Sequence, residues 1–170
     1  MDKIEEYLRR GKKALQILVK SINVIHQTGI TVPNFKKLYN KLLNEDDKSH
    51  LGLEIKNDHD IWLKEFLDAR DASEHPETML PKGQKLYEDF DVSWSEQKKK
   101  WVIDMPRMYF GAGVENFLKG SMYNLFTFCE DIHVLLIKDR LIAGTRIVKL
   151  NEKQMAERGG RNYIIQMIRN

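Results

Sequence analysis

The chain has 170 residues, of which 42% are hydrophobic and 31% charged, and its formal net charge is +3. This length predicts one domain, residues 1–170, with enough apolar residues for a core. The small net charge does not require a nucleic-acid partner, as a strongly basic domain would, and does not exclude one. The single cysteine excludes a disulfide within the chain. No segment resembles a signal peptide or is apolar enough to span a membrane, so we expect a cytoplasmic protein with no membrane partner.

The N-terminal segment has the apolar spacing of a long helix, from about Asp2 to Gln27. Residues suited to helix packing alternate at intervals of four and three: Ile4, Leu8, Gly11, Leu15, Leu18, Ile22 and Ile25. This spacing is typical of a helix that packs against other helices. Roughly 26 residues at 1.5 Å per residue would give about 40 Å, long enough for one member of a bundle.

A second, shorter helix is predicted after Val32-Pro33. Its apolar face would consist of Phe35, Leu38, Tyr39, Leu42 and Leu43. Residues 44–52 are polar and have no helical period, so we expect a loop there.

A central helix is predicted to end at His75, because Pro76 disfavours helical dihedrals in the residue before it. Its apolar face would consist of Ile61, Trp62, Phe66 and Ala69. Asp58 or Asp60 is expected to cap its N-terminus. The run Asp58-His59-Asp60 contains metal-ligand residue types, but acidic residues at a helix N-terminus need no metal to explain them. We therefore predict no metal site.

The end of this central helix carries the residues that most suggest chemistry. Asp71 and His75 are four residues apart, on the same side of a helix. A carboxylate at that spacing could hold the imidazole in one tautomer. The long side chain of Arg70 can reach toward the same helix end.

The run Arg70-Asp71-Ala72-Ser73-Glu74-His75 resembles the Arg-x4–6-His motif of HEPN domains, in which a polar residue often follows the arginine. The resemblance implies a helical bundle that dimerises, with two motif-bearing helix ends facing one another across a two-fold axis. Many HEPN domains are endoribonucleases that need no metal or cofactor. By resemblance, His75 would act as general acid or base, Arg70 would stabilise the phosphate, and Asp71 would orient His75. The reaction would use the ribose 2′-hydroxyl, so RNA and not DNA would be cut.

Other interpretations of the motif stay open. Arg70 and Glu74 are spaced for an ordinary exposed ion pair, with His75 as a favourable charge at a helix C-terminus. Some HEPN domains bind a nucleotide, RNA or a protein without catalysis, and others are toxins paired with an antitoxin. An unrelated helical-bundle adaptor that presents a surface to another protein is the third possibility.

Residues 76–113 are predicted to form an irregular excursion with one short strand at Trp101-Val102-Ile103. The run Lys98-Lys99-Lys100 lies close to Trp94 and Trp101. Basic residues near aromatic ones can bind single-stranded RNA, although solvated lysines beside a buried tryptophan are the simpler interpretation.

The last long helix is predicted from about Val114 to Arg140. One apolar stripe comprises Val114, Leu118, Ser121, Leu125, Phe128, Ile132 and Leu135, and a second comprises Phe117, Met122, Phe126, Cys129 and Leu136. Two stripes predict burial on more than one side, with Cys129 as a small core side chain.

The C-terminal segment changes pattern after Arg140. Residues 146–150 and 162–167 have the composition of strands, and a helical turn is expected between them. The fold class predicted from the whole sequence is mainly α. It comprises an antiparallel bundle of about four helices over residues 2–140 and a small β appendage over residues 141–170.

Overall fold

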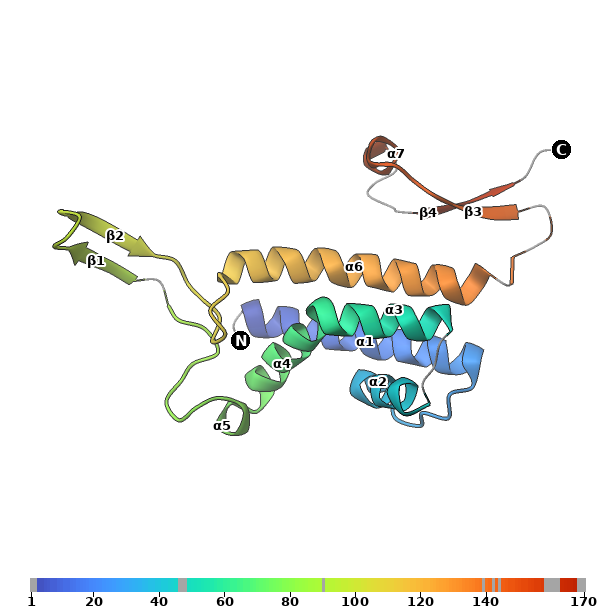
Figure 1. Ribbon diagram of the computed structural model, residues 1–170, viewed down its shortest axis with the longest axis horizontal. Coiled ribbons are helices and arrows are strands. Elements are labelled where there is room, and N and C mark those ends of the chain that lie inside the picture. The colour runs from blue at the N-terminus through green and yellow to red at the C-terminus, as the bar shows by residue number, and fades with distance from the viewer. Residues whose placement is uncertain are drawn as a thin grey trace. The chain divides into compact units, whose positions relative to one another are not determined.

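The structure is a computed structural model, and it describes residues 3–45, 49–89, 91–138, 140–141, 143, 145–157 and 163–167. It is mainly helical, as the sequence predicts, with two small antiparallel sheets (Figure 1). The chain divides into two compact units. Unit 1 comprises Met1–Lys12 and Trp62–Asn124, and unit 2 comprises Lys13–Ile61 and Leu125–Asn170. Two long helices contribute residues to both units: α1 (Lys3–His26) and α6 (Val114–Lys138).

The core of unit 2 lies among the C-terminal parts of α1 and α6, together with α2 (Phe35–Asn44) and α3 (His50–Asp58). Its most deeply buried side chains are Leu15, Leu18, Val19, Ile22, Leu38, Ile55, Phe128 and Ile132. Arg140, just past α6, donates a hydrogen bond to the carbonyl oxygen of Ile25 near the end of α1, at 3.5 Å. In unit 2, α1 and α6 therefore run in the same direction, and α3 runs in the opposite one (Figure 1).

The predicted loop at residues 44–52 is wrong at its C-terminal end. The helix α3 begins at His50, and Ser49 caps it by accepting a hydrogen bond from the backbone N–H of Gly52 at 3.1 Å. Two apolar residues of α3, Leu51 and Ile55, are buried. Only these two residues anchor the first turns, which is too little periodicity for the sequence to reveal a helix. Residues 46–48 lie outside the described part of the chain.

The predicted cap at Asp58 or Asp60 is also wrong, because the helix continues through both residues. A π-helical turn, His59–Leu63, joins α3 to α4 (Lys64–Glu74) without a break. A π-helical turn holds more residues than an α-helical turn, so the apolar stripe shifts around the helix axis at this point. Phe66 and Ala69 are fully buried, as predicted, but Ile61 is exposed and Leu63 is buried in its place.

Unit 1 is held together by close packing of α4 against α1. The ring of Phe66 lies over Gly11, where an added Cβ atom would come within 2.3 Å of the ring Cζ atom. Tyr7 meets the same ring edge to face, with centroids 5.9 Å apart. The Tyr7 hydroxyl and the Ser121 Oγ atom of α6 are 2.9 Å apart, within hydrogen-bond distance. The predicted seam of α1 is thus a packing surface, and Gly11 belongs to it because it leaves room for Phe66.

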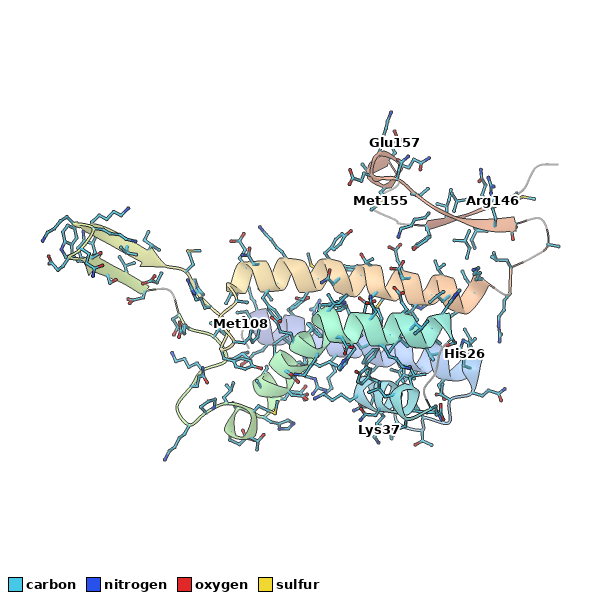
Figure 2. The ribbon with its side chains drawn as sticks, in the orientation of Figure 1. His26, Lys37, Met108, Arg146, Met155 and Glu157 are labelled. Atoms are coloured by element: carbon cyan, nitrogen blue, oxygen red, sulfur yellow. The ribbon has the colours of Figure 1, made fainter. Side chains whose placement is uncertain are left out.

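The excursion between α4 and α6 is more ordered than the sequence predicts. It contains the short helix α5 (Pro76–Met79) and a hairpin of β1 (Asp91–Ser95) and β2 (Lys100–Asp104). The predicted strand at residues 101–103 is confirmed within β2, but its partner β1 was missed. An isolated bridge joins Tyr87 to Met108. Met108, labelled in Figure 2, is almost completely buried.

The helix α6 matches its prediction in length and in its main buried stripe. Leu125 and Phe128 are buried, as predicted, and so are Phe117 and Leu136 of the second stripe. Met122 and Phe126 of that stripe are exposed, so the predicted burial on more than one side is wrong for the central part of the second stripe. Periodicity shows which residues share a face but not whether another element covers it.

The C-terminal segment forms the predicted strand, helical turn and strand. These are β3 (Thr145–Lys149), α7 (Glu152–Glu157) and β4 (Tyr163–Met167), and β3 pairs antiparallel with β4. The Tyr163 hydroxyl donates a hydrogen bond to Asp131 of α6 at 2.5 Å, which ties the hairpin to the helix. No helix in the described part of the chain has the length and hydropathy needed to cross a membrane.

Candidate functional site

The candidate site lies at the C-terminal end of α4, where the sequence predicts it. The helix ends at Glu74, and His75 leaves helical geometry with φ −136° while its N–H still bonds to the carbonyl of Asp71 at 2.8 Å. Pro76 then opens α5, a position that suits its fixed φ angle. The Pro76 ring therefore sets the place at which the helix stops, and it leaves His75 exposed between two helices.

Arg70 and Asp71 are brought together by the structure. The Nη1 atom of Arg70 donates a hydrogen bond to Oδ1 of Asp71, and it lies 3.4 Å from Oε2 of Glu74. The two paired side chains are only 14% and 19% exposed. This ion pair is thus more buried than the exposed pair that the spacing of Arg70 and Glu74 predicts, and water screens it less.

Lys12 of α1 completes the charged group. Its Nζ atom donates to both carboxylate oxygens of Glu74, at 3.0 and 2.9 Å. Two cations, Arg70 and Lys12, therefore face two carboxylates, Asp71 and Glu74, and their formal charges cancel. The sequence could not reveal Lys12, because it is 62 positions from Glu74 and only the packing of α1 on α4 brings them together.

One atom of this charged group has no partner. The Nε atom of Arg70 is buried and makes no hydrogen bond within the described part of the chain. A buried donor left in this state costs about 1–3 kcal/mol, so it calls for an acceptor that the described residues do not supply. A pocket of ≈ 140 Å³ borders Arg70, and its lining residues are Glu5, Leu8, Arg9, Arg70, Ser73 and Glu74.

His75 takes no part in the charged group. Its backbone carbonyl accepts hydrogen bonds from the N–H groups of Thr78 and Met79 and from the Thr78 hydroxyl, each at 3.1 Å. Among the described residues, no group hydrogen-bonds to its imidazole. The carboxylate of Asp71 is bound to Arg70 and not to His75. The structure thus pairs two of the three predicted site residues and leaves the imidazole available to a ligand.

The second group of candidate residues, around His59, lies in unit 2. The rings of Tyr39 and His59 stack with centroids 3.5 Å apart. Asp60 Oδ1 lies 3.1 Å from His59 Nδ1 and accepts a hydrogen bond from the Tyr39 hydroxyl at 3.2 Å. The hydrogen bond from His59 lowers the pKa of Asp60, and that from Tyr39 adds to the effect. Through these contacts, His59 and Asp60 link the π-helical turn to α2. The described residues contain no group of ligands arranged to hold a metal ion.

The comparisons with known proteins leave the family of this chain open: no family model, no curated protein and no solved structure matches it.

Proposed function

We propose that the protein is a HEPN-like endoribonuclease that cleaves RNA through the ribose 2′-hydroxyl, with His75 and Arg70 at its centre. The observation that carries this proposal is that one helix end holds both an exposed imidazole and a buried arginine Nε donor to which the described residues offer no acceptor. Imidazole is suited to moving protons near neutral pH, and a guanidinium is suited to phosphate. Independence of metal comes from the family resemblance of the motif.

In the proposed reaction, the 2′-oxygen attacks the neighbouring phosphorus and the bond from phosphorus to the 5′-oxygen breaks. The proton leaves the 2′-hydroxyl and a proton reaches the 5′-oxygen, so the products are a 2′,3′-cyclic phosphate and a 5′-hydroxyl. His75 serves either proton transfer. A homodimer with C2 symmetry, also proposed from the resemblance, would supply one His75 for each transfer.

Arg70 would stabilise the charge that develops on the phosphate oxygens. Its Nε atom is a buried donor that the ion pairs, which use Nη1, leave without an acceptor among the described residues. The carboxylates of Asp71 and Glu74 hold the guanidinium in place. They also compete with a phosphate for the guanidinium. Asp71 therefore acts on Arg70 in this proposal, whereas the sequence suggested that it orients His75.

The same ion pairs favour a second candidate, a HEPN-like module without catalysis. An arginine whose charge is balanced by two carboxylates can simply fasten α4, and Lys12 extends that fastening to α1. Such a module would bind a nucleotide, RNA or a protein partner, an antitoxin included. Under this alternative, the exposed His75 has no chemical task.

Cleavage of a single-stranded RNA in EDTA, with the matching DNA as a control, separates the two candidates. His75→Ala should lower the rate by roughly 10²–10⁴, and Arg70→Ala by roughly 10²–10³. His50→Ala is the matched control, because His50 is another exposed histidine next to a helix end. Arg70→Lys keeps the charge but loses the Nε donor, so it should lose activity, and a cooperative urea transition would show that the variant is still folded.

Cleavage that requires magnesium, or that survives His75→Ala, would refute the nuclease mechanism. Wild-type protein that cleaves none of a varied set of RNAs, but binds them, would favour the module without catalysis.

A further inference from the structure

Figure 1 shows the β1–β2 hairpin of unit 1. One of its faces is apolar and exposed. The register pairs Trp94 with Trp101 and Val92 with Ile103. Cross-strand partners share a face and side chains alternate along a strand, so these four residues lie on one face. The tryptophan rings meet edge to face at 5.7 Å and remain 44% and 66% exposed. Neither tryptophan is buried, so the simpler interpretation of solvated lysines beside a buried tryptophan does not hold for this hairpin.

An exposed apolar face of this kind is expected to bind a partner. A two-stranded hairpin is at best marginally stable in water, and exposed apolar patches mark interaction sites. Tryptophan is also the residue type most often found at the energetic centre of an interface. Val92 and Ile103 are exposed as well, and so is Met105, which follows β2 in the chain.

The charges of the hairpin indicate which partner fits. Its turn carries three lysines, Lys98, Lys99 and Lys100, with Glu96, whereas its open end carries Asp91 and Asp104. The hairpin Asp91–Asp104 is thus positive at one end, negative at the other and neutral overall. Proteins bind single-stranded nucleic acid in grooves that are positive along their length. The charges of this hairpin are opposite at its two ends, so they do not favour a nucleic-acid partner.

We propose that the apolar face of the hairpin binds the same face of a second copy of the chain, in an antiparallel arrangement with C2 symmetry. A two-fold axis between the Trp94–Trp101 pair and the Val92–Ile103 pair sets each bulky pair on the smaller pair of the other copy. It also brings the positive turn of each copy to the negative open end of the other. The contact is therefore self-complementary in shape and in charge, as an isologous interface must be.

The area of this face suits a reversible dimer. A tryptophan buries about 150–250 Å² when fully covered, so the exposed parts of Trp94 and Trp101 together offer roughly 220 Å² per copy. With Val92, Ile103 and Met105, two copies would bury on the order of 1,000 Å² in total, the lower bound for a specific interface. We therefore expect a dissociation constant in the micromolar range. This inference does not rest on nuclease activity.

Sedimentation of the full chain over about 1–100 μM tests the proposal. The wild type should associate as its concentration rises, and Trp101→Ser should weaken this association at least tenfold. Val24→Ser is the matched control, because Val24 is an apolar residue on α1 that is even more exposed than Trp101, and it should have no effect. A wild-type dimer that Trp101→Ser leaves unchanged would overturn the proposal. Such a result would leave the other proposed dimer, formed through the helix ends, unaffected.

Charge reversal gives a second test that keeps both tryptophans. Lys98→Glu/Lys100→Glu makes both ends negative, and Asp91→Lys/Asp104→Lys makes both ends positive. Each variant alone should dimerise several-fold more weakly at low salt, and an equimolar mixture should recover the dimer as a heterodimer. Failure of the mixture to recover would overturn the proposal. So would a wild type that stays monomeric and binds a labelled oligouridylate through Lys98 and Lys100, which would assign the face to RNA.

Discussion

Replacing Gly11 with alanine tests how closely α1 packs on α4. The added Cβ atom would lie 2.3 Å from Cζ of Phe66 and 3.2 and 3.3 Å from its two Cε atoms. The Phe66 ring is completely buried and is flanked by Tyr7, at 5.9 Å, and by Trp62, at 6.3 Å, so it has little space to move aside. The methyl group must therefore force the two helices apart or push the ring out of its preferred rotamer.

Two opposing effects set the size of the change. Overpacking a core costs about 1–3 kcal/mol. Alanine in a helix interior is favoured over glycine by about 0.5–1 kcal/mol, which offsets part of that cost. The net loss for Gly11→Ala should be about 0.5–2 kcal/mol. With a urea m-value of about 2 kcal/mol/M, the unfolding midpoint should fall by about 0.3–1 M.

Gly120→Ala supplies the control for this experiment. Gly120 also lies in a long helix, but nothing lies within 4 Å of the position of an added Cβ atom. Only the gain in helix propensity remains there, so Gly120→Ala should raise the midpoint. In a Phe66→Leu background the ring is gone, and Gly11→Ala should become neutral or stabilising, a coupling that a double-mutant cycle measures. If Gly11→Ala raises the midpoint as Gly120→Ala does, the packing of α4 on α1 described above is wrong.

Three further predictions concern stability. Phe128→Ala should lower the free energy of unfolding by roughly 3–5 kcal/mol, because Phe128 is almost fully buried, and a urea midpoint equal to that of the wild type would contradict its place in the core. Ser49→Ala removes the cap of α3 and should cost about 0.5–2 kcal/mol by urea titration, whereas a loop at this position would make the change neutral. Burial raises the pKa of Cys129 from 9.0 to about 11, so the unfolded chain loses its thiol proton first as the pH rises. The contribution of the neutral Cys129 thiol to the free energy of unfolding is therefore fully present below about pH 9 and is lost toward pH 11. Over that interval the wild type should lose stability relative to Cys129→Ala, as urea titrations at each pH would measure.

The periodic parts of the sequence determine the long elements. The four-and-three alternation of α1 and of the main stripe of α6 predicts both helices nearly to their ends, and Pro76 predicts where α4 stops. These signals are local, since they depend on 3.6 residues per turn and on the fixed ring of proline. The sequence also places Arg70, Asp71 and His75 at one helix end, and in the structure they lie at the C-terminal end of α4.

Only the tertiary structure decides which side chains meet. Lys12 reaches Glu74, and Phe66 takes the space above Gly11, because two helices that are distant in the chain lie against each other. Asp71 binds the adjacent Arg70 and not His75, although helical spacing places His75, four residues on, on its own side of the helix. Spacing along a chain fixes directions around one helix axis, whereas pairing, burial and an unused donor such as Arg70 Nε depend on what the rest of the fold brings to that side.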